Sequence, residues 1–213
     1  MTKPSAWEGK LDYAIGSGSY LSRAKARILD NSRESLFYAA YELRCCIEAR
    51  QEEYLQAQRD YAKSIPKSWN IGKQHAALES IFSSERIQSI AINFTDHAKI
   101  EALHIPVSTT LRQQAERLGD LLHAQTTYRA ESDVWWSELR NRLVAIYRSA
   151  WTCNQSKVLC PVMLVGEKSI GKMVFSLEPG EARIVQRLAS EKRSVVMQVT
   201  YLTSPPVDWI CDL

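Results

Sequence analysis

Apolar residues recur at helical spacing through most of the first 151 residues, and the segment 32–64 shows this pattern most clearly. Charged residues fill the opposite face of the segment, as expected of an amphipathic helix packed against a core. Asn31, followed three residues later by Glu34, has the form of a capping box at the helix start. We therefore expect one long helix over residues 32–64, with Leu43 and Ile47 in the main core.

Shorter stretches repeat the helical pattern on both sides of this segment. They predict further helices over residues 19–29, 73–85, 109–125 and 132–151. Between the second and the third of these, Ile and Phe alternate with polar side chains, and Thr95, Asp96 and His97 have turn composition. A β-hairpin near residues 88–107 is therefore predicted inside an otherwise helical region.

The pattern changes after Trp151. The runs LCPVMLVG, GKMVFSL and SVVMQVTYL are β-branched or alternating, and Gly, Pro and Ser separate them. The segment PGEARIVQRLASEKR between the last two has the pattern of a short helix. We expect an α+β fold that is mostly α: a helical bundle in residues 1–151 and a small β-rich appendage in residues 152–213, forming a sheet on the bundle or on a partner.

Composition and charge place the chain among ordinary globular proteins. Of its 213 residues, 45% are hydrophobic and 24% charged, so it can bury a core without disulfides or metals. A net charge of +3 permits a nucleic-acid partner, bound directly or through another protein, and does not require one. No apolar run approaches the ~20 residues that span a bilayer, and the first residues lack the apolar stretch of a secretion signal. We expect a cytoplasmic protein without membrane contact.

The cysteines and glycines do not form a known cofactor or metal motif. Five cysteines, two of them the adjacent Cys45 and Cys46, make a poor disulfide framework. Cys153 and Cys160 lack the nearby second pair of Cys or His ligands that a zinc site needs. There is also no glycine-rich phosphate loop. The expectation is a protein with no metal and no cofactor.

Two chemically useful side chains share the segment AERLGDLLHAQ, residues 115–125. Arg117 offers a fork of donors that suits phosphate oxygens, and His123 can exchange a proton near neutral pH. Asp120 lies three residues from each of them and can bridge either one. The alternative is structural: His123 donates to a carbonyl or a neighbouring helix, and Arg117 pairs with Asp120 or with a carboxylate of the long helix.

This pattern, an arginine and then a histidine late in a helical bundle, resembles the HEPN superfamily over roughly residues 19–151. The resemblance implies a bundle that dimerises so that two motifs face each other. It further implies that Arg117 would hold the scissile phosphate of RNA and that His123 would act on the 2′-hydroxyl, without a metal. In one position the chain departs from the nuclease members, because Leu118 follows Arg117 where they usually carry a polar residue.

A second constellation, YELRCCIE, lies in the middle of the long helix. Arg44 and Glu48 are four residues apart and share a face, which favours an intrahelical ion pair. Alternatively, Glu48 reaches across the bundle to Arg117 or His123. Together with the 115–125 segment, this stretch is similar to small helical proteins of bacterial defence gene clusters.

The sequence favours a non-catalytic interaction protein, an accessory subunit of a bacterial multiprotein assembly in antiviral defence. Protein partners are expected, in a hetero-oligomer or a homodimer, and the β-rich segment offers a strand edge for docking. The second hypothesis is a metal-independent ribonuclease of the HEPN type that uses Arg117 and His123, with Asp120 and Glu48 in support.

Overall fold

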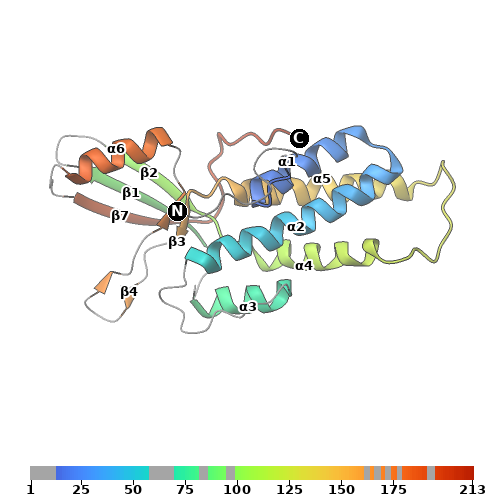
Figure 1. Ribbon diagram of the computed structural model, residues 1–213, viewed down its shortest axis with the longest axis horizontal. Coiled ribbons are helices and arrows are strands. Elements are labelled where there is room, and N and C mark those ends of the chain that lie inside the picture. The colour runs from blue at the N-terminus through green and yellow to red at the C-terminus, as the bar shows by residue number, and fades with distance from the viewer. Residues whose placement is uncertain are drawn as a thin grey trace, which may run out of the picture.

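The computed structural model describes residues 13–57, 70–81, 86–94, 99–160, 164–165, 169–170, 174–176, 179–190 and 195–213. These residues form a helical bundle at one end and a small sheet at the other (Figure 1). The bundle consists of α1 (Ser17–Asp30), α2 (Arg33–Ala57), α4 (Thr109–Leu118) and α5 (Trp135–Asn154), with α3 (Ile71–Ile81) against α2 and α4. The fold class is α+β and mostly α, as predicted.

The long helix α2 is the centre of the bundle, and it contacts every other helix of the bundle. Leu43 has no exposed surface and Ile47 is 1% exposed, so their predicted place in the core is confirmed. They pack in one cluster with Ile28 of α1, Leu118 of α4 and Ile146 of α5. The spacing of apolar residues in the sequence therefore predicts the buried face of α2 correctly.

The start of α2 differs from the prediction. Asn31 closes α1 instead, with a φ of 56° and its amide donating to the carbonyl of Arg27. Ser32 caps α2, because its hydroxyl accepts a hydrogen bond from the amide of Ser35 at 3.2 Å. The predicted capping box of Asn31 and Glu34 is therefore wrong. The predicted ends of this helix and of the 73–85 helix, residues 58–64 and 82–85, lie outside the described residues.

The predicted helix over residues 109–125 is also shorter than expected. α4 ends at Leu118, and a 3-10 turn, η1 (Gly119–Leu122), follows it. The next helix begins later than predicted, where the carboxylate of Asp133 accepts a hydrogen bond from the amide of Trp135 at 2.9 Å. An exposed loop of the bundle thus replaces the second half of the expected helix.

The sheet brings together two distant parts of the chain. β1 (Ile87–Phe94) and β2 (Lys99–His104) form the predicted antiparallel hairpin, although its expected turn lies outside the described residues. On its other side β1 pairs antiparallel with β7 (Val195–Leu202), which gives the strand order β2-β1-β7. Strands from both sides of residue 151 therefore share one sheet.

Smaller elements complete the sheet end of the molecule. They are β3 (Val158–Cys160), which pairs with β6 (Val174–Phe175), β4 (Leu164–Val165), which pairs with β5 (Ser169–Ile170), and the helix α6 (Pro179–Ser190). The helix α6 confirms the short helix expected in this region. A second, smaller apolar cluster gathers Ile90, Ala102 and Val158 between the sheet and β3.

After β7 the chain returns to the bundle. This return segment, residues 203–213, reaches α5 and α1, where Cys211 and Leu213 pack on the main core. The hydroxyl of Tyr147 donates to Asp212 at 2.6 Å, and Lys25 forms an ion pair with the same carboxylate at 2.8 Å. The chain that follows β7 thus ties the sheet to the bundle. None of the helices in the described part of the chain is long and apolar enough to cross a lipid bilayer.

Candidate functional site

The residues of the predicted ribonuclease motif lie at the end of the bundle far from the sheet (Figure 1). Arg117 is in the last turn of α4 and Asp120 is in η1. His123 follows η1 with an extended backbone, at φ −89° and ψ 164°. Because the chain leaves the helix before His123, the expectation of one helix that carries both groups was wrong.

All three side chains of the motif are exposed to solvent. None of them forms a hydrogen bond or an ion pair with any residue that the structure describes. The structural alternative required a partner for His123 or Arg117, and the described residues supply none. Both groups are therefore open to an external ligand.

Glu48 lies away from the motif and pairs within its own helix. The Nε of Arg44 donates to Glu48 at 3.0 Å, which confirms the predicted intrahelical ion pair. Another nitrogen of the same guanidinium lies against Gly119, at the place where a Cβ atom of that residue would sit. The long helix therefore touches the motif segment through Arg44, not through Glu48.

A buried polar cluster, which the sequence did not reveal, joins the bundle to the sheet. This junction cluster consists of Arg50, Glu53, Tyr54, Cys153 and Ser156. Arg50 is only 5% exposed. Its guanidinium donates to Glu53 at 2.8 Å and to the carbonyl of Ser156 at 2.7 Å, and it lies 4.6 Å from the ring centroid of Tyr54. A buried charge held this way is paired and hydrogen-bonded, as stability requires.

Tyr54 and Cys153 of the junction cluster stay protonated near neutral pH. Burial raises the pKa of the Tyr54 phenol, whose hydroxyl donates to the carbonyl of Ile105. Burial likewise raises the pKa of the Cys153 thiol, so the nucleophilic thiolate is disfavoured. We conclude that the cluster holds α2, α5 and the strands together.

Glu53 also fixes the start of α1. The amide of Ser17 donates to one oxygen of its carboxylate at 2.8 Å, and the hydroxyl of Ser17 lies 2.9 Å from the other. A carboxylate at a helix N-terminus is stabilised by the unpaired amides and the helix dipole. The first helix and the long helix therefore meet at this one side chain.

An open hollow of about 780 Å³, which we call the acidic groove, lies beside Glu53. Three carboxylates of α2 line it, Glu48, Glu52 and Glu53, and the rings of Tyr20 and Tyr41 stand with them. The apolar side chains of its walls are Ile15, Ala49, Ala57, Leu159 and Val174. Carboxylates, phenol rings and aliphatic walls together suit a long cationic side chain such as Lys or Arg.

Two side chains of the acidic groove, Tyr41 and Cys45, have raised pKa values. A hydrogen bond with Cys45 raises the pKa of Tyr41 to about 12. Burial raises the pKa of the Cys45 thiol as well. Both side chains therefore stay neutral near pH 7, where a general base or a nucleophile would need a pKa near the working pH.

Tyrosines and arginines continue from the acidic groove along α1 and α2. The guanidinium of Arg23 lies 4.0 Å from the ring centroid of Tyr13 and 4.5 Å from that of Tyr20. Further along, Arg27 lies 5.3 Å from the ring centroid of Tyr38. Tyr and Arg are the residue types most enriched at the centres of protein interfaces.

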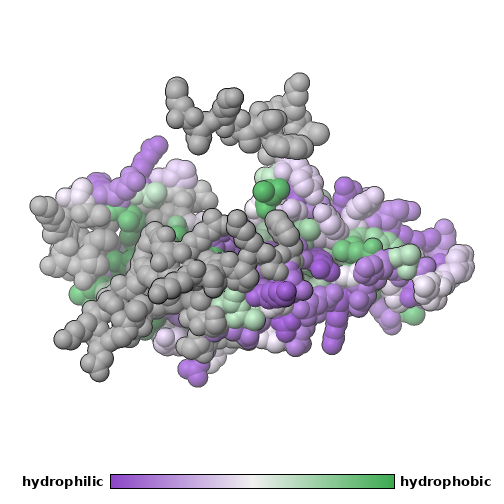
Figure 2. All heavy atoms as spheres, turned by 60° about the horizontal axis from the view of Figure 1, so that its bottom comes forward, coloured by the Kyte–Doolittle hydropathy of each residue, from purple (hydrophilic) through white to green (hydrophobic). Residues whose placement is uncertain are grey.

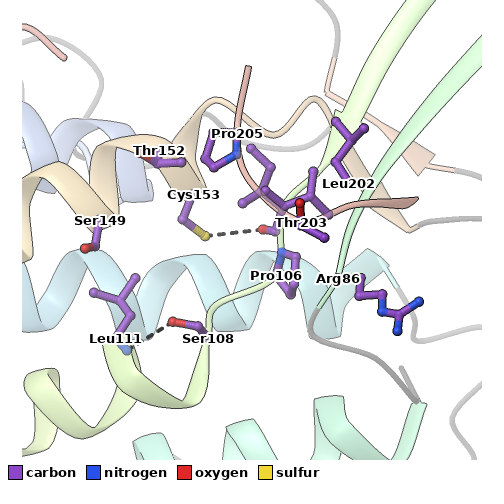
Figure 3. Close-up of a pocket in the computed structure, with 12 residues that line it drawn as sticks. Arg86, Pro106, Ser108, Leu111, Ser149, Thr152, Cys153, Leu202, Thr203 and Pro205 are labelled. Carbon is purple, nitrogen blue, oxygen red and sulfur yellow. Dashed lines mark hydrogen bonds between the residues drawn. The ribbon is translucent and has the colours of Figure 1, made fainter. Parts of the chain in front are cut away.

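A second hollow, of about 680 Å³, lies where α4, α5 and the end of β7 meet (Figure 3). Three of its hydroxyls are engaged at α4 and α5: Ser149 and Thr152 donate to carbonyls one turn back, and Ser108 accepts the amide of Leu111. Thr203 adds a fourth hydroxyl. The thiol of Cys153 forms part of its wall (Figure 3). This hollow therefore offers mainly shape and apolar surface.

Neither hollow contains a metal site in the described residues. No group of three or more His, Cys, Asp or Glu side chains there is placed to hold an ion. The acidic groove can recognise a ligand through its carboxylates and its tyrosine rings.

The sequence contained one signal for the junction cluster. Arg50 is seven residues after Leu43 and three after Ile47, which puts it on the buried face of α2. A charge on that face needs a buried partner. Glu53, three residues further along the helix, follows helical spacing. The carbonyl of Ser156 could not be named without the fold, because it lies 106 residues away.

No protein-family model, no curated protein and no solved structure matches this chain. The resemblance to the HEPN superfamily consequently rests on the motif residues and the bundle alone, and it stays a prediction.

Proposed function

We propose that the protein is a non-catalytic accessory subunit that binds a partner protein through the acidic groove. The proposal rests on one observation. The carboxylates of Glu48, Glu52 and Glu53 and the rings of Tyr20 and Tyr41 line the same open hollow. A Lys or Arg of the partner would lay its aliphatic stem on the apolar wall and its charged head beside the carboxylates. Glu48 and Glu53 already pair with Arg44 and Arg50, so Glu52 would be the main contact of the charged head. The place of this subunit in an antiviral assembly remains a prediction from the resemblance.

Exposed aromatic residues beside the acidic groove support a protein ligand rather than a small molecule. Tyr41 is 45% exposed and Tyr38 is 58% exposed, on the same side of α2 as the groove. Such rings can bury large areas at low entropic cost when a partner covers them. The partner surface would thus extend from the groove along α1 and α2.

The proposal is tested by charge reversal in the acidic groove. The tagged protein, purified from its native host, should elute in a complex with a second protein at fixed stoichiometry, and increasing salt should weaken that complex. Glu52→Lys and Tyr41→Ser should each release the second protein while the circular dichroism spectrum stays unchanged.

The matched control is Asp208→Lys, an equal charge change at an exposed site of the return segment. This variant should keep the complex. Glu52→Lys protein that retains its partner as well as Asp208→Lys would disprove binding through the acidic groove.

A metal-independent ribonuclease is the second candidate, and the exposure of Arg117 and His123 favours it. In this reaction Arg117 would hold the phosphate and His123 would act on the 2′-hydroxyl. We expect no cleavage of single-stranded RNA in EDTA above background. Products ending in a cyclic phosphate that disappear in both Arg117→Ala and His123→Ala would establish the enzyme and overturn our preference.

A further inference from the structure

Strand β7 is an edge of the three-stranded sheet. It pairs with β1 on one side, and no other strand of the described residues pairs with it on the other. Figure 1 shows it along the outer border of the sheet, at the end of the molecule away from the bundle. An edge strand presents unpaired amides and carbonyls that can pair with another strand.

The sequence of β7, VVMQVTYL, has none of the features that normally protect an edge. It contains no charged residue and no proline over eight positions. Val196 is 68% exposed and Tyr201 is 55% exposed. In Figure 2 apolar side chains gather at this end of the molecule. An uncharged edge of this length is a docking surface for a strand.

The opposite edge of the sheet, β2, is protected. It carries the charged side chains of Lys99 and Glu101, which form an ion pair. Next to it lies β3, whose Val158 carbonyl accepts a hydrogen bond from Nδ1 of His104 at 2.9 Å. Of the two edge strands, β7 is therefore the one to which a further strand can be added.

We infer that β7 pairs antiparallel with β7 of a second copy of this chain, in a dimer with a two-fold axis at Val199. The pattern of the strand is symmetric about this residue, with Gln198 and Thr200 polar on either side and apolar residues beyond them. Antiparallel pairing would place Met197 opposite Tyr201 and Gln198 opposite Thr200 of the second copy. Each of these cross-strand contacts is of a favourable type, and none brings like charges together.

The two faces of the sheet continue across this interface. Met197 and Val199 pack on the apolar cluster around Ile90, and alternation puts Tyr201 on the same side. Gln198 and Thr200 are exposed on the opposite side. The dimer would therefore contain one six-stranded sheet of order β2-β1-β7-β7-β1-β2. Met197, Val199 and Tyr201 would lie on one face of β7, and Val196, Gln198 and Thr200 on the other. This surface is separate from the acidic groove.

A pair of double variants at the same two exposed positions tests the inference. Gln198→Lys with Thr200→Lys puts like charges directly opposite each other across the axis, and the protein should become monomeric. Gln198→Lys with Thr200→Glu puts opposite charges there, and the protein should stay dimeric. The mass in solution should be measured by light scattering over a dilution series, with the wild type as reference and circular dichroism as the check of folding.

Cysteine cross-linking tests the register and does not depend on the lysine variants. With Cys45 and Cys211 replaced by Ser, Val199→Cys lies on the axis and should form a disulfide-linked dimer under mild oxidation. Gln198→Cys, one position away, lies opposite Thr200 and should cross-link far less. A wild-type protein that stays monomeric at every concentration, or a Lys/Lys variant as dimeric as the wild type, would overturn the inference; a monomer would leave the edge to the strand of another protein.

Discussion

His104 ties the stability of the sheet to pH. Its ring is buried between β2 and β3, and its centroid lies 5.2 Å from that of the Tyr54 ring, with the two planes tilted by 60°. Burial lowers the pKa of His104 from 6.5 to about 4, although the hydrogen bond to the carbonyl of Val158 opposes the shift. The neutral ring is therefore part of the folded state.

Acid should destabilise the protein through this residue. Below pH 6.5 the unfolded chain binds a proton at His104 and the folded chain does not, so stability falls until the folded pKa of about 4 is reached. The loss at that point is about 3 kcal/mol of unfolding free energy. Urea unfolding across this pH range should show a smaller loss for His104→Gln than for the wild type. An equal loss of unfolding free energy with falling pH in the two proteins would show that His104 is not the cause of the acid sensitivity.

Residues with local partners were the ones that sequence reasoning could place. The Arg44–Glu48 ion pair was predicted because both members lie one turn apart on a single helix. The junction cluster was not, because Arg50 depends on a carbonyl of Ser156 that only the fold brings near. The same reason hid the packing of His104 on Tyr54.

At the scale of elements, α4 ends just before Gly119, against which Arg44 of α2 packs. The backbone of Gly119 is in the right-handed helical region, at φ −56° and ψ −35°, so no steric rule requires glycine there. The reason for glycine is instead the guanidinium of Arg44, which occupies the place of a side chain. The turn η1 and the loop that carries His123 start from this contact.

Whether Gly119→Ala stabilises or destabilises the protein should depend on Arg44. In the wild type the added methyl group meets the guanidinium, and overpacking should cost about 1 kcal/mol of unfolding free energy. In an Arg44→Ala background the same change should stabilise the protein by about 0.5 kcal/mol, because alanine loses less backbone entropy than glycine. A double-mutant cycle by urea unfolding measures both effects. Equal effects in the two backgrounds would mean that Arg44 does not pack on Gly119.

The pattern of the sequence predicted which elements exist better than where they end. The helices, the hairpin and α6 all follow from periodicity and breakers. Their ends depend on single residues: Asn31 closes α1, Ser32 starts α2, and the Asp133 carboxylate accepts the first amide of α5. The strand order β2-β1-β7 joins segments about 100 residues apart, and no local pattern encodes such a pairing.

At the scale of the whole molecule, the return segment links the sheet to the bundle. Trp209 meets Trp151 of α5 edge to face, with ring centroids 6.2 Å apart. Asp212 accepts hydrogen bonds from Tyr147 of α5 and Lys25 of α1. Because β7 precedes this segment directly, its contacts also fix the sheet relative to the bundle.

Deleting residues 207–213 should therefore weaken both ends of the molecule. The loss of apolar burial at Trp209, Cys211 and Leu213 should lower the unfolding free energy by about 2–4 kcal/mol. Ile210 is 85% exposed, so Ile210→Ala should change the unfolding free energy by no more than about 0.5 kcal/mol. Hydrogen exchange should become faster in β7 as well as in α5, because the segment anchors the strand. A deletion that leaves the amides of β7 as protected as in the wild type would show that β1 alone holds the strand in place.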